Sequence, residues 1–121
     1  MSRIKGDLPQ RTFDFACKVM AVADELPNNV KGWVVGKQLL RAGTSVGANV
    51  READNAHTDS DFAYKCSLAR KEAAEAEYWL DLCIATSILK REVASALRTE
   101  AHELIRVLST VVLKTQQFIE K

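Results

Sequence analysis

The sequence predicts an all-α protein, an antiparallel up-down four-helix bundle. Apolar residues recur every three or four positions through four long segments, at about 10–26, 30–54, 60–87 and 91–119, which is the period of one helix face. Only two prolines and five glycines occur among 121 residues, of which 47% are hydrophobic; this composition is typical of a compact helical protein rather than a disordered one. We therefore expect one domain over residues 1–121, with residues 1–9 as a loosely ordered lead-in.

Segment 10–26 carries two neighbouring apolar stripes. The first stripe is Phe13, Ala16, Met20 and Ala23, and the second is Phe15, Val19, Val22 and Leu26. Together they predict a helix with a broad apolar face. Pro27 ends this helix, and either Asn28 or Asn29 can cap the next one.

Segment 30–54 has an apolar side around Leu39 and Val46, flanked by a row of glycines, Gly36, Gly43 and Gly47. Each glycine inside a helix costs about 1 kcal/mol relative to alanine. We expect the close approach of another helix to offset that cost. A groove for a ligand phosphate is the alternative, but no Lys-Ser or Lys-Thr pair follows the glycines as a phosphate loop requires.

A polar row runs along the other flank of the same segment: Gln38, Arg41, Ser45, Asn49 and Glu52. Groups at the border of a core need hydrogen-bond partners. These partners can lie within the bundle, across a subunit interface or on a ligand, and the sequence leaves all three open. Trp33 lies away from the apolar stripe, so it either marks a contact surface or is covered at a bundle edge.

Segment 60–87 follows a polar loop. Either Thr58 or Ser60 can cap the start of its helix. Its apolar residues form a coiled-coil-like seam: Phe62, Cys66, Ala69, Ala73, Ala76, Leu80 and Cys83. Alanines Ala69, Ala73 and Ala76 occupy the middle of the seam and allow close packing. Our hypothesis is that they face the glycine row of segment 30–54.

The turn before the last helix lies somewhere between Ile84 and Arg91, where neither glycine nor proline marks its position. Segment 91–119 then has a long seam of its own, Leu97, Leu104, Leu108, Val111, Thr115 and Phe118. This apolar face is longer than one bundle core needs.

The two central segments resemble a known family. The matching runs are Gln38-Leu39-Leu40-Arg41-Ala42, Thr44-Ser45-Val46, Ala48-Asn49-Val50 with Glu52, then Asp61-Phe62, Lys65, Leu68-Ala69, Lys71-Glu72-Ala73, Glu75 and Glu77-Tyr78-Trp79-Leu80. They resemble the four-helix-bundle family of 23S rRNA intervening sequence proteins, also called S23 ribosomal proteins. The family commonly has Glu-Gly where this chain has Glu52-Ala53, so we expect the turn after segment 30–54 to lie a few residues later.

The resemblance implies an antiparallel four-helix bundle that assembles into a ring, typically a homopentamer. It also implies a genetic link with RNA, because family members are encoded within large-subunit ribosomal RNA genes. Related proteins are accessory proteins of diversity-generating retroelements, where they assist a reverse transcriptase. For most members no activity is established, so a scaffold or interaction module for a protein partner is the function we expect.

Charge bears on the alternative function, a nucleic-acid-binding accessory protein. Lys plus Arg number 17 and Asp plus Glu 16, giving a formal net charge of +1; this balance argues against strong nonspecific binding of RNA or DNA. A ring could still gather basic side chains on one surface. The candidate phosphate contacts are Lys31, Lys37, Arg41, Arg51, Lys65, Arg70 and Lys71.

The three cysteines, Cys17, Cys66 and Cys83, are widely spaced and form no zinc pattern. We predict free thiols, buried or partly buried, in a reducing compartment. The first residues lack the apolar run of a signal peptide, and no apolar run is long enough to span a membrane. The expected location is the cytoplasm.

No catalytic or metal site is predicted. A di-iron bundle needs two Glu-x-x-His motifs, but neither His57 nor His102 follows a glutamate by three residues. The run from His102 to Arg106 begins like a zinc protease helix and lacks the second histidine. We therefore expect no enzyme activity and no cofactor.

Overall fold

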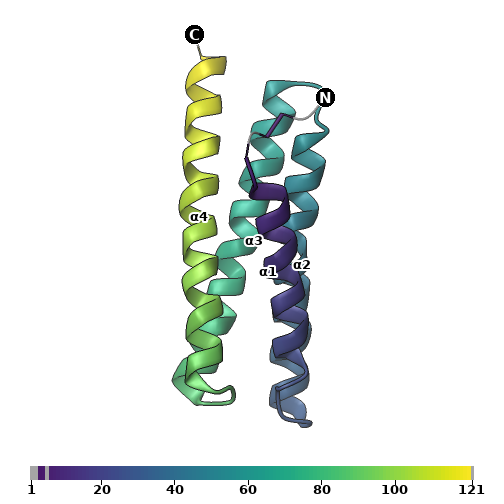
Figure 1. The fold of residues 1–121 in the computed structure, drawn as a ribbon, viewed down its shortest axis with the longest axis vertical. Coiled ribbons are helices and arrows are strands. Elements are labelled where there is room, and N and C mark those ends of the chain that lie inside the picture. The colour runs from purple at the N-terminus through teal and green to yellow at the C-terminus, as the bar shows by residue number, and fades with distance from the viewer. Residues whose placement is uncertain (1–2, 5, 121) are drawn as a thin grey trace.

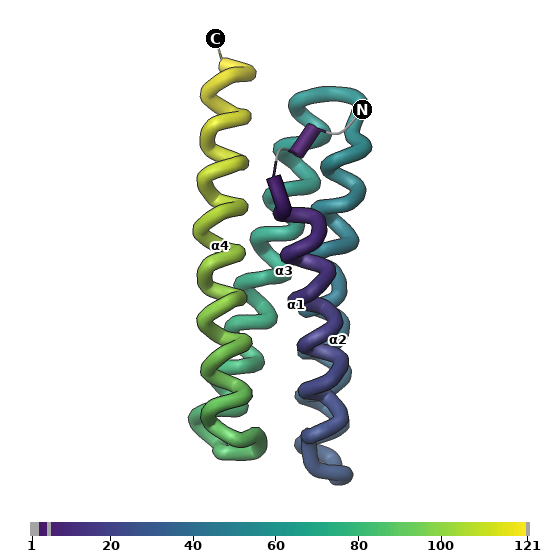
Figure 2. Tube along the Cα trace, in the orientation of Figure 1, coloured from purple at the N-terminus to yellow at the C-terminus, as the bar shows by residue number. Residues whose placement is uncertain are grey.

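Four helices joined by short connections form an all-α bundle, as predicted. The computed structural model describes residues 3–4 and 6–120, with helices α1 (Leu8–Ala23), α2 (Val30–Asp54), α3 (Asp59–Thr86) and α4 (Arg91–Ile119). Each helix runs antiparallel to the one before it (Figures 1 and 2). The helix bounds differ from the predicted ones by three residues at most, and α2 ends at Asp54 as predicted.

Local signals explain where the helices begin. The Asn29 side chain accepts a hydrogen bond from the Gly32 backbone N–H at 3.0 Å, and Thr58 accepts one from the Asp61 N–H at 3.0 Å. Helix α1 begins two residues earlier than predicted because Pro9 lies in its first turn, where a missing N–H costs no helical hydrogen bond.

The turn between α3 and α4 depends on one left-handed residue. Ser87 has φ 58° and ends α3, donating its backbone N–H to Ile84 O at 3.3 Å. Glycine or asparagine is the usual residue at such a position. A serine there gives no sequence signal, so the turn could not be placed from the sequence.

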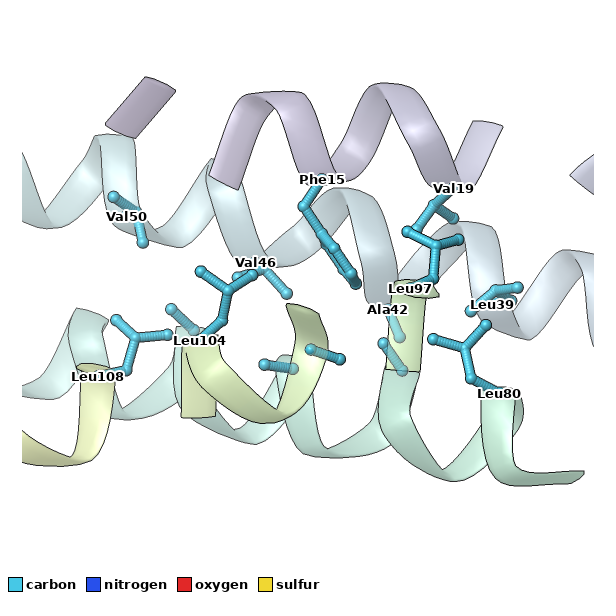
Figure 3. Close-up of a cluster of buried hydrophobic side chains, with 14 of the residues drawn as sticks. Phe15, Val19, Leu39, Ala42, Val46, Val50, Leu80, Leu97, Leu104 and Leu108 are labelled. Atoms are coloured by element: carbon cyan, nitrogen blue, oxygen red, sulfur yellow. The ribbon is translucent and has the colours of Figure 1, made fainter. Parts of the chain in front are cut away.

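The core lies between all four helices. Phe15 and Val19 of α1 point toward residues of α2, α3 and α4 (Figure 3), and both are fully buried. The second of the two stripes of α1 is therefore the buried one, while Phe13 and Met20 of the first stripe remain exposed.

The four helices differ greatly in length. With 16 residues, α1 is about 24 Å long, whereas the 29 residues of α4 extend about 44 Å. Helix α1 packs mainly on α2 and has a much smaller contact with α4. The C-terminal end of α4 consequently extends well beyond the start of α1 (Figure 1).

The lead-in is attached to the α2–α3 loop. The Arg3 Nε–H donates to Ala56 O at 2.7 Å, its guanidinium pairs with Asp59, and the Ile4 N–H donates to Asp54 Oδ1 at 2.7 Å. Residues 3 and 4 thus bond to the end of α2, the α2–α3 loop and the start of α3, and the loose order predicted for the lead-in stays a prediction. The prediction for residues 1–2 and 5 lies outside the described residues.

The glycine row of α2 faces α1, so the hypothesis that it faces the alanines of α3 is wrong. A Cβ at Gly43 would lie 2.8 Å from Val19, and one at Gly47 would lie 3.2 Å from the Thr12 carbonyl oxygen. A Cβ at Gly36 would meet only Leu26. Close approach of a helix does offset the glycines, but that helix is α1. Ala69, Ala73 and Ala76 are fully buried in the core.

Candidate interaction surfaces

Apolar side chains remain uncovered along the outer side of α1 and α2. Phe13 is 50% exposed, Met20 57% and Trp33 60%. Phe13 also borders a groove of about 400 Å³, which we call the α1–α2 groove; its lining residues are Pro9, Phe13, Ala16, Thr44, Gly47, Ala48, Arg51 and Glu52. The structure decides between the two interpretations of Trp33, because no bundle edge covers its ring. Its indole N–H donates to Asn28 Oδ1 at 2.8 Å.

A second apolar surface lies near the N-terminal end of α2, where its first turns meet the end of α3. This α2–α3 patch surrounds a hollow of about 400 Å³ lined by Val30, Lys31, Val34, Val35, Trp79, Leu82, Thr86 and Ile88. Trp79 makes an edge-to-face contact with Tyr78 at a centroid distance of 5.0 Å. The chain therefore presents two different apolar surfaces, one between α1 and the second half of α2 and the other between the first turns of α2 and the end of α3.

The polar row joins α2 to α3 within one chain. Arg41 pairs with Glu72 at 3.0 Å and with Glu75, and Lys65 pairs with Glu52 at 3.0 Å. The hydrogen bond with Glu75, followed by the charge of Glu72, raises the pKa of Arg41. Of the three alternatives for these two charged residues, partners within the bundle are the ones observed.

The other members of the row are uncharged. The Ser45 hydroxyl donates to Arg41 O at 2.6 Å, and the Asn49 side chain donates to Ser45 O at 2.9 Å. Both bonds stay within α2. Gln38 is half-buried in the same row. The row thus combines bonds inside α2 with ion pairs to α3.

The candidate phosphate contacts do not form one basic surface on the subunit. Arg41 and Lys65 are paired with carboxylates, and Arg70 Nε–H donates to Ser109 Oγ at 2.5 Å. The Arg51 guanidinium lies over the Phe13 ring at 5.9 Å.

Three lysines complete that candidate set. Lys31 borders the α2–α3 patch, while Lys37 and Lys71 are exposed on α2 and α3. Positive and negative side chains are therefore interspersed over these two helices.

Two of the three thiols are buried. Cys66 and Cys83 lie in the core, and burial raises the pKa of Cys66 to about 11 and raises that of Cys83 as well. Cys17 is exposed on α1, so the prediction that it is at least partly buried is wrong. It lies on the solvent side of a helix whose buried stripe is Phe15, Val19 and Val22.

The histidines lie in different surroundings. His57 is exposed in the α2–α3 loop, and His102 Nδ1 lies 2.8 Å from Glu77 Oε2 on α3. Across residues 3–4 and 6–120, no group of three or more His, Cys, Asp and Glu side chains is placed to hold a metal ion. In the same part of the chain, no helix has both the length and the apolar character needed to cross a bilayer.

Comparison with known proteins agrees with this architecture. A family model described as 23S rRNA-intervening sequence protein matches residues 6–110. A crystal structure of a protein of unknown function from the S23 ribosomal protein family of Bacteroides thetaiotaomicron VPI-5482 is similar, with a TM-score of 0.81 and 37% sequence identity over 87% of this chain and 97% of that one. No curated protein matches. The match over most of the chain shows that it belongs to the 23S rRNA-intervening sequence protein family.

Proposed function

We propose that this protein is a non-catalytic scaffold that self-associates into a closed ring. The observation that carries the proposal is the presence of two different apolar surfaces at different ends of α2, the α1–α2 groove and the α2–α3 patch. Exposed apolar patches of this kind mark interaction sites. The resemblance of the central segments to ring-forming proteins implies five subunits.

Two different surfaces on one subunit favour a ring over a symmetric dimer. In a two-fold dimer the same patch meets itself, whereas a head-to-tail contact joins one surface to another and closes when the rotation permits. The proposal joins the groove of one copy to the patch of the next. It places the ring in the cytoplasm, where exposed Cys17 remains reduced.

Nucleic-acid binding is the alternative function. The family description links its members to ribosomal RNA genes, and Lys37 and Lys71 are exposed for phosphate contact. The ion pairs of Arg41 and Lys65 favour the scaffold, because paired cations release fewer counterions from a phosphate backbone.

Mixing two variants tests the head-to-tail contact. Phe13→Asp disables the groove and Val34→Asp disables the patch, so each variant alone should be a monomer by light scattering. Mixed, each still offers one intact surface, and the pair should form a one-to-one dimer that cannot extend. Tyr64→Asp, at an exposed residue outside both surfaces, is the control and should keep the full mass. Retention of the full mass by both disabled variants would overturn the proposal.

A labelled RNA separates the two functions. If the protein is a scaffold, we expect no salt-sensitive binding to a short RNA, whether the protein is a monomer or a ring. Binding that weakens steeply with salt, and weakens again in Lys37→Glu and Lys71→Glu, would establish the accessory protein instead.

A further inference from the structure

The last turns of α4 continue the apolar seam of the bundle into an open groove. Leu104 and Leu108 are fully buried, Val111 and Thr115 are half-buried, and Phe118 is 67% exposed. These residues follow one another at spacings of three and four, so they occupy one face of α4. The family model ends at residue 110, so the exposed end of the seam lies beyond the family pattern.

The groove exists because α1 is short. Beside the lower part of α4, α1 fills the fourth corner of the bundle, and the Arg11 guanidinium pairs with Glu100 at 2.7 Å there. Helix α1 begins at Leu8, and the residues before it form the non-helical lead-in. Figure 1 shows α4 continuing past this point without α1 beside it.

The groove has the dimensions of a helix site. It measures about 560 Å³ and continues into a second hollow of about 290 Å³, and the two share Arg3, Phe62, Lys114 and Thr115. Its α4 lining runs from Val107 to Phe118, about 16 Å along the helix axis. Three turns of length suit an elongated occupant with side chains at helical spacing.

The lining of the groove contains three cations, Arg3, Arg11 and Lys114, and two carboxylates, Asp7 and Asp59. Arg3 and Arg11 are paired with Asp59 and Glu100. Lys114 is the rim cation for which the described residues provide no ion pair. An occupant with a carboxylate beside its apolar face would complement Lys114.

We propose that this α4 groove, bounded by Val107, Val111, Lys114, Phe118 and Phe62, binds an amphipathic helix of a protein partner with acidic residues flanking its apolar stripe. That helix would lie along the last turns of α4, beside the lead-in residues Ile4 and Asp7 that line the same groove. The proposal gives the scaffold its docking site, and it holds whether or not the subunits form a ring.

Designed peptides provide the probe. One is a 16-residue amphipathic helix with leucine at the seam positions and glutamate beside them; the other replaces the glutamates with lysines. Fluorescence anisotropy should show binding of the glutamate peptide. Lys114→Glu should weaken that binding about fivefold, the value of one exposed ion pair, and should reverse the preference toward the lysine peptide.

Variants along α4 locate the site. Phe118→Asp should remove binding, whereas Leu113→Asp, at a residue that is also exposed but does not line the groove, should leave it unchanged. Both variants should melt like the unaltered protein. Phe13→Asp should retain peptide binding even as a monomer, so failure of the ring and failure of this site are distinguishable.

Three results would overturn the proposal. One is binding of neither peptide. Another is equal binding by the Phe118→Asp variant. The third is a doubled mass in light scattering that Phe118→Asp abolishes, since this would make a second copy the occupant.

Discussion

Gly43 of α2 lies directly against Val19 of α1: a Cβ added to Gly43 would sit 2.8 Å from both methyl groups of Val19. Val19 is fully buried, and a β-branched side chain has little rotamer freedom with which to move away. The close approach of α1 and α2 therefore depends on the missing side chain.

Replacing Gly43 with alanine should destabilise the fold. Overpacking costs about 1–3 kcal/mol, and the better helix propensity of alanine recovers about 1 kcal/mol, so we expect a net loss of up to about 2 kcal/mol. Urea unfolding measures it. Gly36→Ala is the control, because its nearest neighbour is the flexible end of Leu26 at 3.3 Å.

A double variant identifies the cause of that loss. In a Val19→Ala background both 2.8 Å contacts are absent and only the 3.1 Å contact with the Cβ of residue 19 remains, so Gly43→Ala should cost much less than in the unaltered protein. An unchanged penalty in that background would show that Val19 is not the group that excludes a side chain at position 43.

Ser87→Gly should stabilise the protein. Ser87 adopts φ 58°, a conformation that costs a non-glycine residue about 1 kcal/mol, and we expect a gain of about 0.5–1 kcal/mol in the free energy of unfolding. Ser95→Gly, in the interior of α4, should instead lose about 0.5 kcal/mol. Equal effects at the two sites would argue against a left-handed Ser87.

Thiol reactivity should separate Cys17 from the other two cysteines. Cys17 is exposed, whereas Cys66 and Cys83 are buried, so a colourimetric disulfide reagent should modify one thiol quickly in the folded protein and all three in denaturant. Cys17→Ser should remove the fast phase. A fast phase that persists in this variant would mean that the core opens readily around α3.

Stability should fall at alkaline pH partly through Cys66. Burial raises its pKa from 9.0 to about 11, so between these values the unfolded chain has lost a proton that the folded chain retains. The free energy of unfolding therefore decreases as pH rises from about 9 to 11. Denaturant titrations at pH 8 and 10.5 should show a smaller decrease in Cys66→Ala, which lacks this thiol.

The spacing of apolar residues predicts the four helices but does not predict which helices pack against one another. The glycine row of α2 was found from its spacing, yet a helical wheel gives the side of a helix and not the element that faces it. Gly43 therefore meets Val19 of α1 rather than Ala73 of α3. The same reason applies to α1, where two apolar stripes fit the helical period and only packing selects Phe15 over Phe13.

Charged pairs and turns were predictable to different degrees. Arg41 stood out in the polar row, but its partners Glu72 and Glu75 lie on another helix, more than thirty positions along the chain, where no local pattern connects them. Asn29 and Thr58 carry their capping signal in their side chains. Ser87 carries no such signal, so the sequence restricts the turn between α3 and α4 only to the range from Ile84 to Arg91.

The solution mass of the unaltered protein tests the central claim most directly. Light scattering across a concentration series should give a five-subunit mass that is independent of concentration, as a closed ring requires. A monomer of 13.4 kDa throughout the series would contradict the account. In that case the α1–α2 groove and the α2–α3 patch would need a different partner.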